Sequence, residues 1–327
     1  MPTIVGKEVG PIGLGLMGLT RRANPISTDD GIQVLKTALD NGVNLWNGAD
    51  FYGPPDNNSL TLLEKYFAKY PEDADKVVIS IKGAAGPQDM TPDGSPDAVR
   101  ASVDNCIKLL NGRKKIDLFQ PDRIDPKTPL EVTLGVLDKE YVQTGKIGGI
   151  GLSEVKAATI REAAKYTKVA SLRASLNVGK TDIFENGVAA ATAELRIPLV
   201  AYSPMGRGFL TGQFKTLDDV PQNSLLRHFP RFQLDTFPIN IQFAEQVAET
   251  AKRKGVSPAQ FTLGWTIAKG NGSPVVIPIP GATTSERVVE NSKKVDLTEA
   301  ELAELDETLK KFETVGDRYP DFIPIEG

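Results

Sequence analysis

The feature that most constrains the fold of this chain is an alternation of short, apolar, β-branched runs with amphipathic helical patterns. Eight strand–helix units in roughly 280 residues match a (β/α)8 barrel, whose core takes about 250 residues. A doubly wound open sheet alternates in the same way and is the competing architecture. No change in composition marks a linker, so we expect residues 1–327 to form one α/β TIM-barrel domain with long active-site loops. The expected strands begin near Ile12, Val43, Val77, Ile116, Gly148, Val169, Ile197 and Val275.

Several helices have readable ends. Thr128 to Glu131 has the residues of a capping box with proline at the first helical position, and Ser257 to Gln260 repeats this arrangement. Gly42 is placed to end the first helix. An amphipathic pattern from Ala300 to Phe312 predicts an extra C-terminal helix.

Composition excludes several classes of protein. The net charge of −4 and the absence of a basic stripe argue against nucleic acid as a partner. The single cysteine, Cys106, excludes an internal disulfide framework and lies at an apolar helix position, so we expect it to be buried. The single histidine, His228, disfavours a zinc hydrolase and a Ser-His-Asp enzyme, and we predict no metal. No apolar run approaches the ~18 residues of a membrane span, and the start lacks a signal-peptide pattern, so a cytoplasmic enzyme is expected.

A glycine-rich segment near the start matches a dinucleotide-binding pattern. Gly13 to Gly18 reads G-x-G-x-x-G, which requires a helix to open at its third glycine. Here the first helix is expected only after Ser27, so we reject this interpretation. The glycines are better explained by a bend at the first barrel strand, where backbone can approach a ligand.

The stretch from Thr211 to Asn240 lacks clear periodicity. It contains Phe214, Phe229, Phe232 and Phe237. Long irregular insertions are usually active-site loops or disorder. The aromatic residues favour a loop that closes a pocket, with packing against the barrel rim as the alternative.

Polar residues follow the expected strands. Tyr52 lies just past one strand and Lys82 ends the next. In a barrel the chemistry gathers at these C-terminal ends. A lysine ammonium beside a phenol lowers the phenol's pKa from ~10 and makes it a usable proton donor, which suits reduction of a carbonyl. A structural tyrosine and a surface lysine are the alternative.

Two later strand ends have the character of anion sites. The glycines from Tyr202 to Gly212 allow backbone amides to approach a diphosphate. Hydroxyl groups and an arginine lie at a helix start from Ile279 to Arg287. Together they suggest a phosphorylated cofactor.

These motifs make the chain resemble an aldo-keto reductase along nearly its whole length. The family's Asp-Thr-Ala-x-x-Tyr-Gly corresponds to Asn47 to Gly53, and its lysine to Lys82. Its Tyr-Ser-Pro-Leu-Gly run matches Tyr202 to Gly212, and its Ile-Pro-Gly to Glu-Asn signature matches Ile279 to Asn291. Trp46 to Gly53 and two further segments, from Asp117 and from Gly151, are most similar to the fungal pyridoxal reductase branch.

The resemblance implies roles for particular residues. Tyr52 is the proton donor, Lys82 its partner, and Asn47 and Asp122 occupy the other catalytic positions. Tyr202 stacks on the nicotinamide, whose carboxamide lies at Ser153, Glu154 and Arg173. The implied cofactor is NADPH. Its remaining binding residues are Ser203, Pro204, Met205, Gly206, Gly208, Leu210 and Gly212 at the diphosphate, Gly281 and Thr283 after the last strand, Arg287 at the 2′-phosphate, and Glu290 and Asn291 at the adenine.

The chain departs from the family at the catalytic site and at the carboxamide site. The usual aspartate is Asn47 and the usual histidine is Asp122, so the carboxylate that neutralises Lys82 has moved to another strand end. Lost catalysis, as in the related potassium-channel beta subunits, is the rival explanation. Glu154 and Arg173 replace neutral residues, and we predict an ion pair between them, with two unrelated charges as the alternative.

The sequence therefore predicts an NADPH-dependent reductase of a small-molecule aldehyde, with pyridoxal, a vitamin B6 aldehyde, as the leading substrate and pyridoxine as its product. A general aldehyde or ketone reductase is the alternative. Two rivals are a non-catalytic NADPH-binding sensor and a lyase that uses Lys82 as a Schiff-base nucleophile. Oligomeric state is not readable from the sequence.

Overall fold

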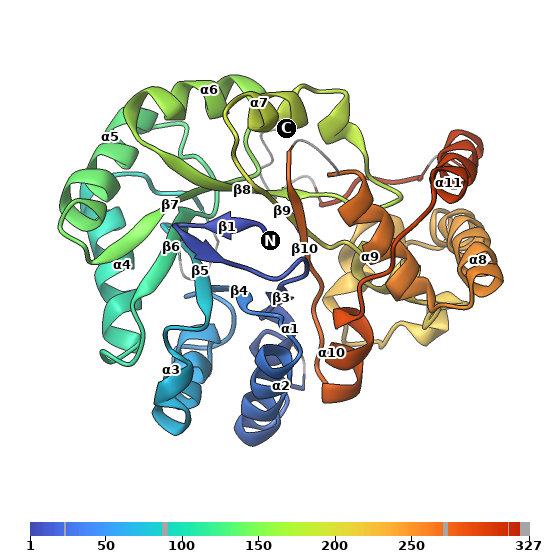
Figure 1. Cartoon of the computed structure of the whole chain (residues 1–327), viewed down its shortest axis with the longest axis horizontal. Coiled ribbons are helices and arrows are strands. Elements are labelled where there is room, and N and C mark those ends of the chain that lie inside the picture. Colours follow the sequence, from blue (N-terminus) through green and yellow to red (C-terminus); the bar gives the residue numbers. More distant parts are fainter. Residues whose placement is uncertain (23, 87–90, 271–273, 313, 321–327) are drawn as a thin grey trace.

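Eight parallel strands form a closed barrel with helices outside it (Figure 1). The computed structural model describes residues 1–22, 24–86, 91–270, 274–312 and 314–320. All eight expected strands are present. The barrel strands are β3 (Leu14–Gly15), β4 (Leu45–Ala49), β5 (Val78–Gly83), β6 (Ile116–Pro121), β7 (Ile147–Ser153), β8 (Val169–Ser175), β9 (Leu199–Tyr202) and β10 (Val276–Ile279).

The order of the strands decides between the two architectures that the alternation allowed. Neighbours in the sheet follow chain order from β3 to β10, whereas a doubly wound sheet reverses direction at a switch point. The ring closes where Gly15 pairs with Gly281, and where the Gly13 and Gly15 amides donate to Pro278 (2.9 Å) and Pro280 (3.0 Å) carbonyls. The fold is a (β/α)8 barrel, as predicted.

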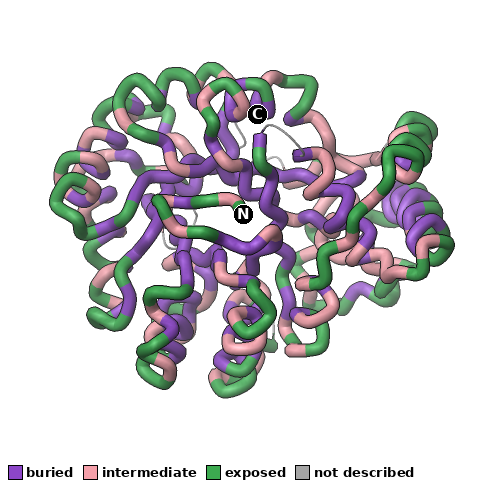
Figure 2. Tube along the Cα trace, in the orientation of Figure 1, coloured by how far each residue is buried: buried purple, intermediate pink, exposed green. Residues whose placement is uncertain are grey.

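The helices cover the outside of the barrel with their apolar faces inward. In α4, Val99, Val103 and Cys106 are buried, which confirms the expected placement of the cysteine. Figure 2 shows the same division, with buried strands inside and exposed outer faces on the helices. The helices are α1 (Met17–Thr20), α2 (Thr28–Asp40), α3 (Ser59–Lys69), α4 (Pro96–Leu109), α5 (Leu130–Val136), α6 (Ala157–Tyr166), α7 (Val188–Glu194), α8 (Phe237–Lys254), α9 (Pro258–Ala268), α10 (Ser285–Ser292) and α11 (Glu299–Lys311).

Most predicted helix ends are confirmed. Ser257 and Gln260 form the expected capping box, and Gly42, with φ +76°, follows α2 in the left-handed conformation typical of a helix end. The extra C-terminal helix is α11. The capping box at Thr128 is wrong, because the Thr128 hydroxyl donates to Asp125 (2.7 Å) and α5 has no side-chain cap. The one-turn helix α1 was also not expected, because it begins at Met17, inside the glycine-rich segment, whereas the first helix was predicted only after Ser27.

A hairpin that the sequence did not reveal closes the N-terminal end of the barrel. Strands β1 (Thr3–Ile4) and β2 (Lys7–Glu8) pair antiparallel and lie across the middle of the ring (Figure 1). The turn residues Val5 and Gly6 both have positive φ, and valine is a poor signal for such a turn. Ile4 is buried in a cluster that includes Leu45 and Val78, the first residues of β4 and β5, so side chains fill the N-terminal end of the barrel.

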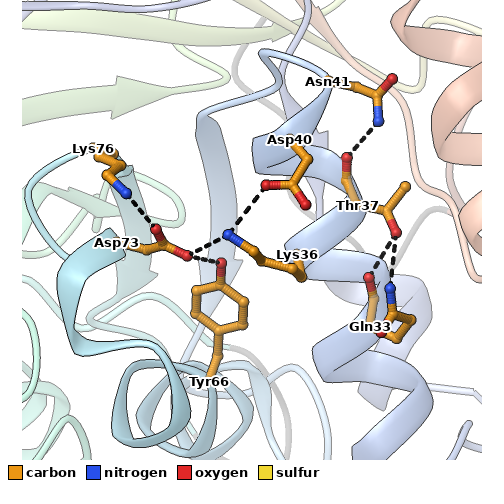
Figure 3. A network of polar contacts seen from close by, with 8 residues as sticks. All are labelled: Gln33, Lys36, Thr37, Asp40, Asn41, Tyr66, Asp73 and Lys76. Carbon is orange, nitrogen blue, oxygen red and sulfur yellow. Dashed lines mark hydrogen bonds and ion pairs between the residues drawn. The ribbon is translucent and has the colours of Figure 1, made fainter.

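A polar network joins the outer helices α2 and α3 (Figure 3). Its centre is the carboxylate of Asp73, whose side chain is fully buried. It accepts hydrogen bonds from Lys36 (3.0 Å), Lys76 (2.8 Å) and the Tyr66 hydroxyl (2.8 Å). Although burial alone would raise the pKa of Asp73, these donors lower it below its usual value. The network therefore fixes two helices with an ionised carboxylate.

The stretch from Thr211 to Asn240 is built from short 3₁₀ helices and the start of α8, which begins earlier than expected at Phe237. Phe232 packs on Phe209, with ring centroids 4.4 Å apart, and both are buried. Phe229 instead faces Tyr319, with centroids 5.8 Å apart, and lines a hollow. Packing therefore explains part of the aromatic content. No helix in the described ranges is long and apolar enough to cross a membrane.

Candidate active site

The predicted tyrosine and lysine meet at the C-terminal end of the barrel. The register between β4 and β5 places Ala49 level with Lys82, so Tyr52, three residues further on, lies above the end of the lysine's strand. The Lys82 ammonium lies 4.7 Å from the centre of the Tyr52 ring and 5.0 Å from that of Phe51. Tyr52 and Lys82 are 5% and 3% exposed, so their charges and dipoles interact with little screening by water.

The expected carboxylate is beside this lysine. Asp122, directly after β6, is ion-paired with Lys82, and both side chains are buried. Burial raises the pKa of the Asp122 carboxyl, but the charges of Lys82 and Arg123 outweigh it and lower the pKa to about 2. Asp122 is therefore ionised at neutral pH.

Asn47 has a different partner. Its side-chain amide donates to the carbonyl (3.1 Å) and hydroxyl (3.2 Å) oxygens of Ser80, two residues before Lys82 on β5. Asn47 is 2% exposed. A neutral amide thus holds the end of β4, while the negative charge beside Lys82 comes from Asp122.

The predicted ion pair between Glu154 and Arg173 is wrong. The Glu154 carboxylate is paired with Arg318, and it also accepts a hydrogen bond from the Ser175 amide (2.8 Å). The Arg173 guanidinium makes a long bond of 3.4 Å to Ser153 and lies 3.9 Å from the centre of the Tyr202 ring. Arg173 therefore stacks on Tyr202, while Glu154 is paired with Arg318.

The C-terminal segment also contacts Tyr202. The hydroxyl groups of Tyr202 and Tyr319 are 2.9 Å apart. The Arg207 guanidinium lies 5.0 Å from the centre of the Tyr319 ring. Arg318 and Tyr319, which follow the last helix, thus lie beside Tyr202 at the end of β9.

The two segments expected at anion sites come together. Arg287, in the first turn of α10, lies 3.4 Å from the Gln213 side chain, just past the loop after β9. In that loop Ser203, Arg207 and Gly208 have positive φ. Gly208 has φ +104°, and a Cβ there would lie 2.7 Å from the Phe214 ring, so a glycine is needed at this position.

The remaining residues predicted around the cofactor lie on the same rim. Some follow β9, others follow β10, and the last two lie in the final turn of α10. They are Pro204, Met205, Gly206, Leu210, Gly212, Gly281, Thr283, Glu290 and Asn291.

A family model, described as the aldo/keto reductase family, matches residues 11–310. This chain belongs to the aldo-keto reductase family. It is 39% identical to the probable pyridoxal reductase 2 of Schizosaccharomyces pombe, over 98% of this chain and 97% of that protein. It is 33% identical to an aldo-keto reductase of the same yeast whose name specifies NADP(+), over 97% and 93%. A glycerol dehydrogenase structure from Gluconobacter oxydans has the same fold, with a TM-score of 0.82 at 23% identity and 98% coverage of both chains.

In this aldo-keto reductase, several residues beside the candidate site were not identified from the sequence. Arg318 and Tyr319 reach the site from the chain end, and Ser80 holds Asn47. Asp50, directly before Phe51, is held by Ser102 (3.0 Å), and burial raises its pKa to about 6. Arg318 and Tyr319 follow the last helix in no periodic pattern, so nothing local signalled them. Ser80 could have been found from its position opposite Asn47 on the neighbouring strand.

Proposed function

We propose that this aldo-keto reductase uses NADPH to reduce an aldehyde, and that pyridoxal, converted to pyridoxine, is its main substrate. The observation that carries the proposal is the buried arrangement of Tyr52, Lys82 and Asp122 at the end of the barrel. It keeps a phenol, an ammonium and a carboxylate together, as in a site that protonates a developing alkoxide.

The rim beside these residues fits a nicotinamide cofactor. Among the described residues, Arg173 Nε and Ser175 Oγ are buried without a hydrogen-bond partner. Buried polar atoms are rarely left so, and a carboxamide would supply both donors and acceptors. Arg287 is exposed at the start of α10, which suits a 2′-phosphate. The NADP(+) in the name of one relative agrees with this choice.

When bound, NADPH supplies a hydride to the carbonyl carbon. The C=O π bond then breaks toward oxygen, and the Tyr52 hydroxyl donates its proton to that oxygen, giving the alcohol. The Lys82 ammonium stabilises the phenolate that remains. Asp122 offsets the charge of Lys82. Asn47 holds β4 against β5 and thereby fixes the position from which Tyr52 acts.

Pyridoxal as substrate is supported by two observations. The relative that is 39% identical carries the name of a pyridoxal reductase. Aromatic side chains also lie near the site, with Phe51 beside Tyr52 at 5.3 Å and Phe229 beside Tyr319 at 5.8 Å. Flat faces of this kind suit a pyridine ring.

The test is NADPH oxidation, followed at 340 nm, with pyridoxal, benzaldehyde and butanal. We expect kcat/KM for pyridoxal to exceed that for butanal by at least about tenfold, since ring contacts contribute on the order of 1–2 kcal/mol. Efficient benzaldehyde reduction with inert pyridoxal would replace pyridoxal by a general aldehyde substrate. NADPH binding without turnover of any aldehyde would favour a sensor protein. A Schiff-base lyase is disfavoured because Lys82 is paired with a buried carboxylate, whereas that chemistry needs a neutral lysine.

A further inference from the structure

The backbone of Glu154 is in a conformation that glutamate rarely adopts. Its φ is +56°, in the left-handed region that favours glycine and is tolerated by asparagine. The amide of Glu154 donates to the Arg173 carbonyl (2.9 Å) and continues the pairing of β7 with β8. Such a strained residue persists where its surroundings fix it, and it often belongs to a functional site.

The side chain of Glu154 is fixed by two partners. One carboxylate oxygen accepts from the Ser175 amide, and the other is paired with Arg318. The side chains of Glu154 and Arg318 are 5% and 11% exposed, so this is a buried ion pair. Each carboxylate oxygen has two lone pairs, and the carboxylate can therefore accept further hydrogen bonds.

Arg173, the other cation nearby, is poorly placed to hold Glu154. Its contacts are the 3.4 Å bond to Ser153 and the face of Tyr202, and its Nε has no partner among the described residues. A nicotinamide ring stacked on the same face of Tyr202 would have to displace this guanidinium. The Arg318 guanidinium lies further from Tyr202, 5.9 Å from the centre of its ring. Arg318 can therefore stay paired with the Glu154 carboxylate.

The segment that carries Arg318 is bound to the barrel rim along its length. Thr314 donates to the Gly179 carbonyl (3.1 Å), and the Asn240 side chain exchanges two hydrogen bonds with Val315 (2.9 and 3.0 Å). Tyr319 then meets Tyr202. Arg318 is thus held from both sides and approaches Glu154 from a fixed direction.

We propose that Arg318 is a positioning residue for the cofactor: through its ion pair it holds the Glu154 carboxylate as an acceptor for the N–H₂ group of the nicotinamide carboxamide. This inference rests on the proposed function. Without Arg318 the Glu154 carboxylate would be buried without a counter-ion, and it would turn toward solvent. The C-terminal segment thereby becomes one wall of the nicotinamide site.

The experiment compares two ligands that differ at the carboxamide. NADP⁺ can donate an N–H to Glu154, whereas its 3-acetylpyridine analogue has a methyl ketone there and cannot. Kd for each is measured by quenching of protein fluorescence. We expect the wild-type protein to bind NADP⁺ about tenfold more tightly than the analogue, the value of one hydrogen bond to a charged group. Arg318→Met should reduce this ratio to near one, and Arg318→Lys should keep part of it.

The matched control is Arg231→Met. Arg231 donates to the Gly316 carbonyl (3.0 Å) and so holds the same segment without contacting Glu154. Arg231→Met should leave the ratio of the two Kd values, for the analogue and for NADP⁺, unchanged. Adding Glu154→Asn to Arg318→Met should restore the ratio, because the asparagine carbonyl accepts the bond without a counter-ion and suits a left-handed backbone.

Equal weakening of both ligands by Arg318→Met would overturn the inference and leave Arg318 a packing role only. A ratio near one in the wild-type protein would also overturn it. If the wild type binds NAD⁺ rather than NADP⁺, the cofactor proposal is wrong, and the ratio is measured with the matching NAD⁺ pair. If it binds neither, both proposals are wrong.

Discussion

At the scale of single residues, the hydroxyl of Tyr52 is the group whose removal tests the proposed chemistry most directly. Tyr52→Phe keeps the ring against which Lys82 packs and removes the proton donor. We expect kcat for aldehyde reduction to fall by about 10²–10⁴ while Kd for NADPH changes little. Tyr70→Phe, which removes a hydroxyl from an outer helix end, is the control and should leave kcat unchanged. Normal turnover of Tyr52→Phe would assign the proton to another group.

The position of the carboxylate beside Lys82 gives a second prediction. Asp122→Ala removes the carboxylate that is paired with the buried Lys82 ammonium, so kcat for aldehyde reduction should fall by at least about tenfold because the ion pair that holds this ammonium beside Tyr52 is lost. Asn47 and Lys82 lie on the same face of the sheet, since Asn47 is level with Ser80. Adding Asn47→Asp to Asp122→Ala should therefore restore much of kcat. A double variant that stays slow would contradict the idea that the charge has moved between strands.

Cofactor choice depends on an exposed arginine. Arg287 is the one cationic residue in the sequence from Gly281 to Arg287, and its guanidinium donates to the neutral side-chain amide of Gln213 (3.4 Å). Arg287→Ala should raise Kd for NADPH about tenfold and Kd for NADH less than about threefold, because NADH lacks the 2′-phosphate. Lys293→Ala, at the other end of α10, serves as the control. Equal losses for both cofactors would give Arg287 a structural role only.

At the scale of elements, the Asp73 network provides a prediction about stability. Asp73→Asn removes the charge that holds Lys36 and Lys76 and should lower the free energy of unfolding by about 2–3 kcal/mol at pH 7. The folded-state pKa of Asp73 is lowered, so its contribution is present above the unfolded value near 3.8 and is lost as pH falls through the folded value. Urea unfolding should therefore show the wild type and the variant converging below about pH 4.

The control for this network is Asp40→Asn. Asp40 contacts Lys36 at 3.1 Å, but its side chain is 57% exposed. Its loss should cost less than about 1 kcal/mol. A comparable cost for both variants would show that the buried position of Asp73 adds nothing.

Helix ends were predicted correctly where the residues that determine them lie within a few positions of one another. The capping box at Ser257 and the glycine after α2 involve residues a few positions apart, and both are confirmed. The box at Thr128 failed because Asp125 competes for the same hydroxyl. The start of α8 was missed because Phe237 was assigned to an irregular loop.

At the scale of the whole molecule, we expect the hairpin at the N-terminal end of the barrel to contribute to stability and the opposite end to carry the candidate active site. Ile4 is 1% exposed and lies in one buried cluster with Leu45 and Val78. Ile4→Ala should lower the free energy of unfolding by about 2–4 kcal/mol. Kd for NADPH should stay unchanged, because the site lies at the other end of the strands. Thr3→Ala, at an exposed position beside it, should change stability by less than about 0.5 kcal/mol.

Much of the barrel was predictable because each strand shows as an apolar run and each helix as an amphipathic pattern in the sequence. Eight alternating strand–helix units are compatible with only two architectures, a barrel and a doubly wound sheet. Tyr52, Lys82 and Asp122 could be placed together because strand ends of a barrel meet at one rim. The partner of Glu154 could not, because Arg318 approaches from the far end of the chain by a route that no periodic pattern describes. The hairpin was missed because its turn uses valine where asparagine is common.

The closure of the ring has a consequence for how the protein is made. The edge of β3 is completed by residues around Gly281, which leave the ribosome long after Gly15. During translation the sheet therefore carries an unpaired edge, which is a template for wrong pairing. Chains that stop before β10 keep that edge open, and we expect such nascent products to associate with one another and to depend on chaperones more than the full-length chain does.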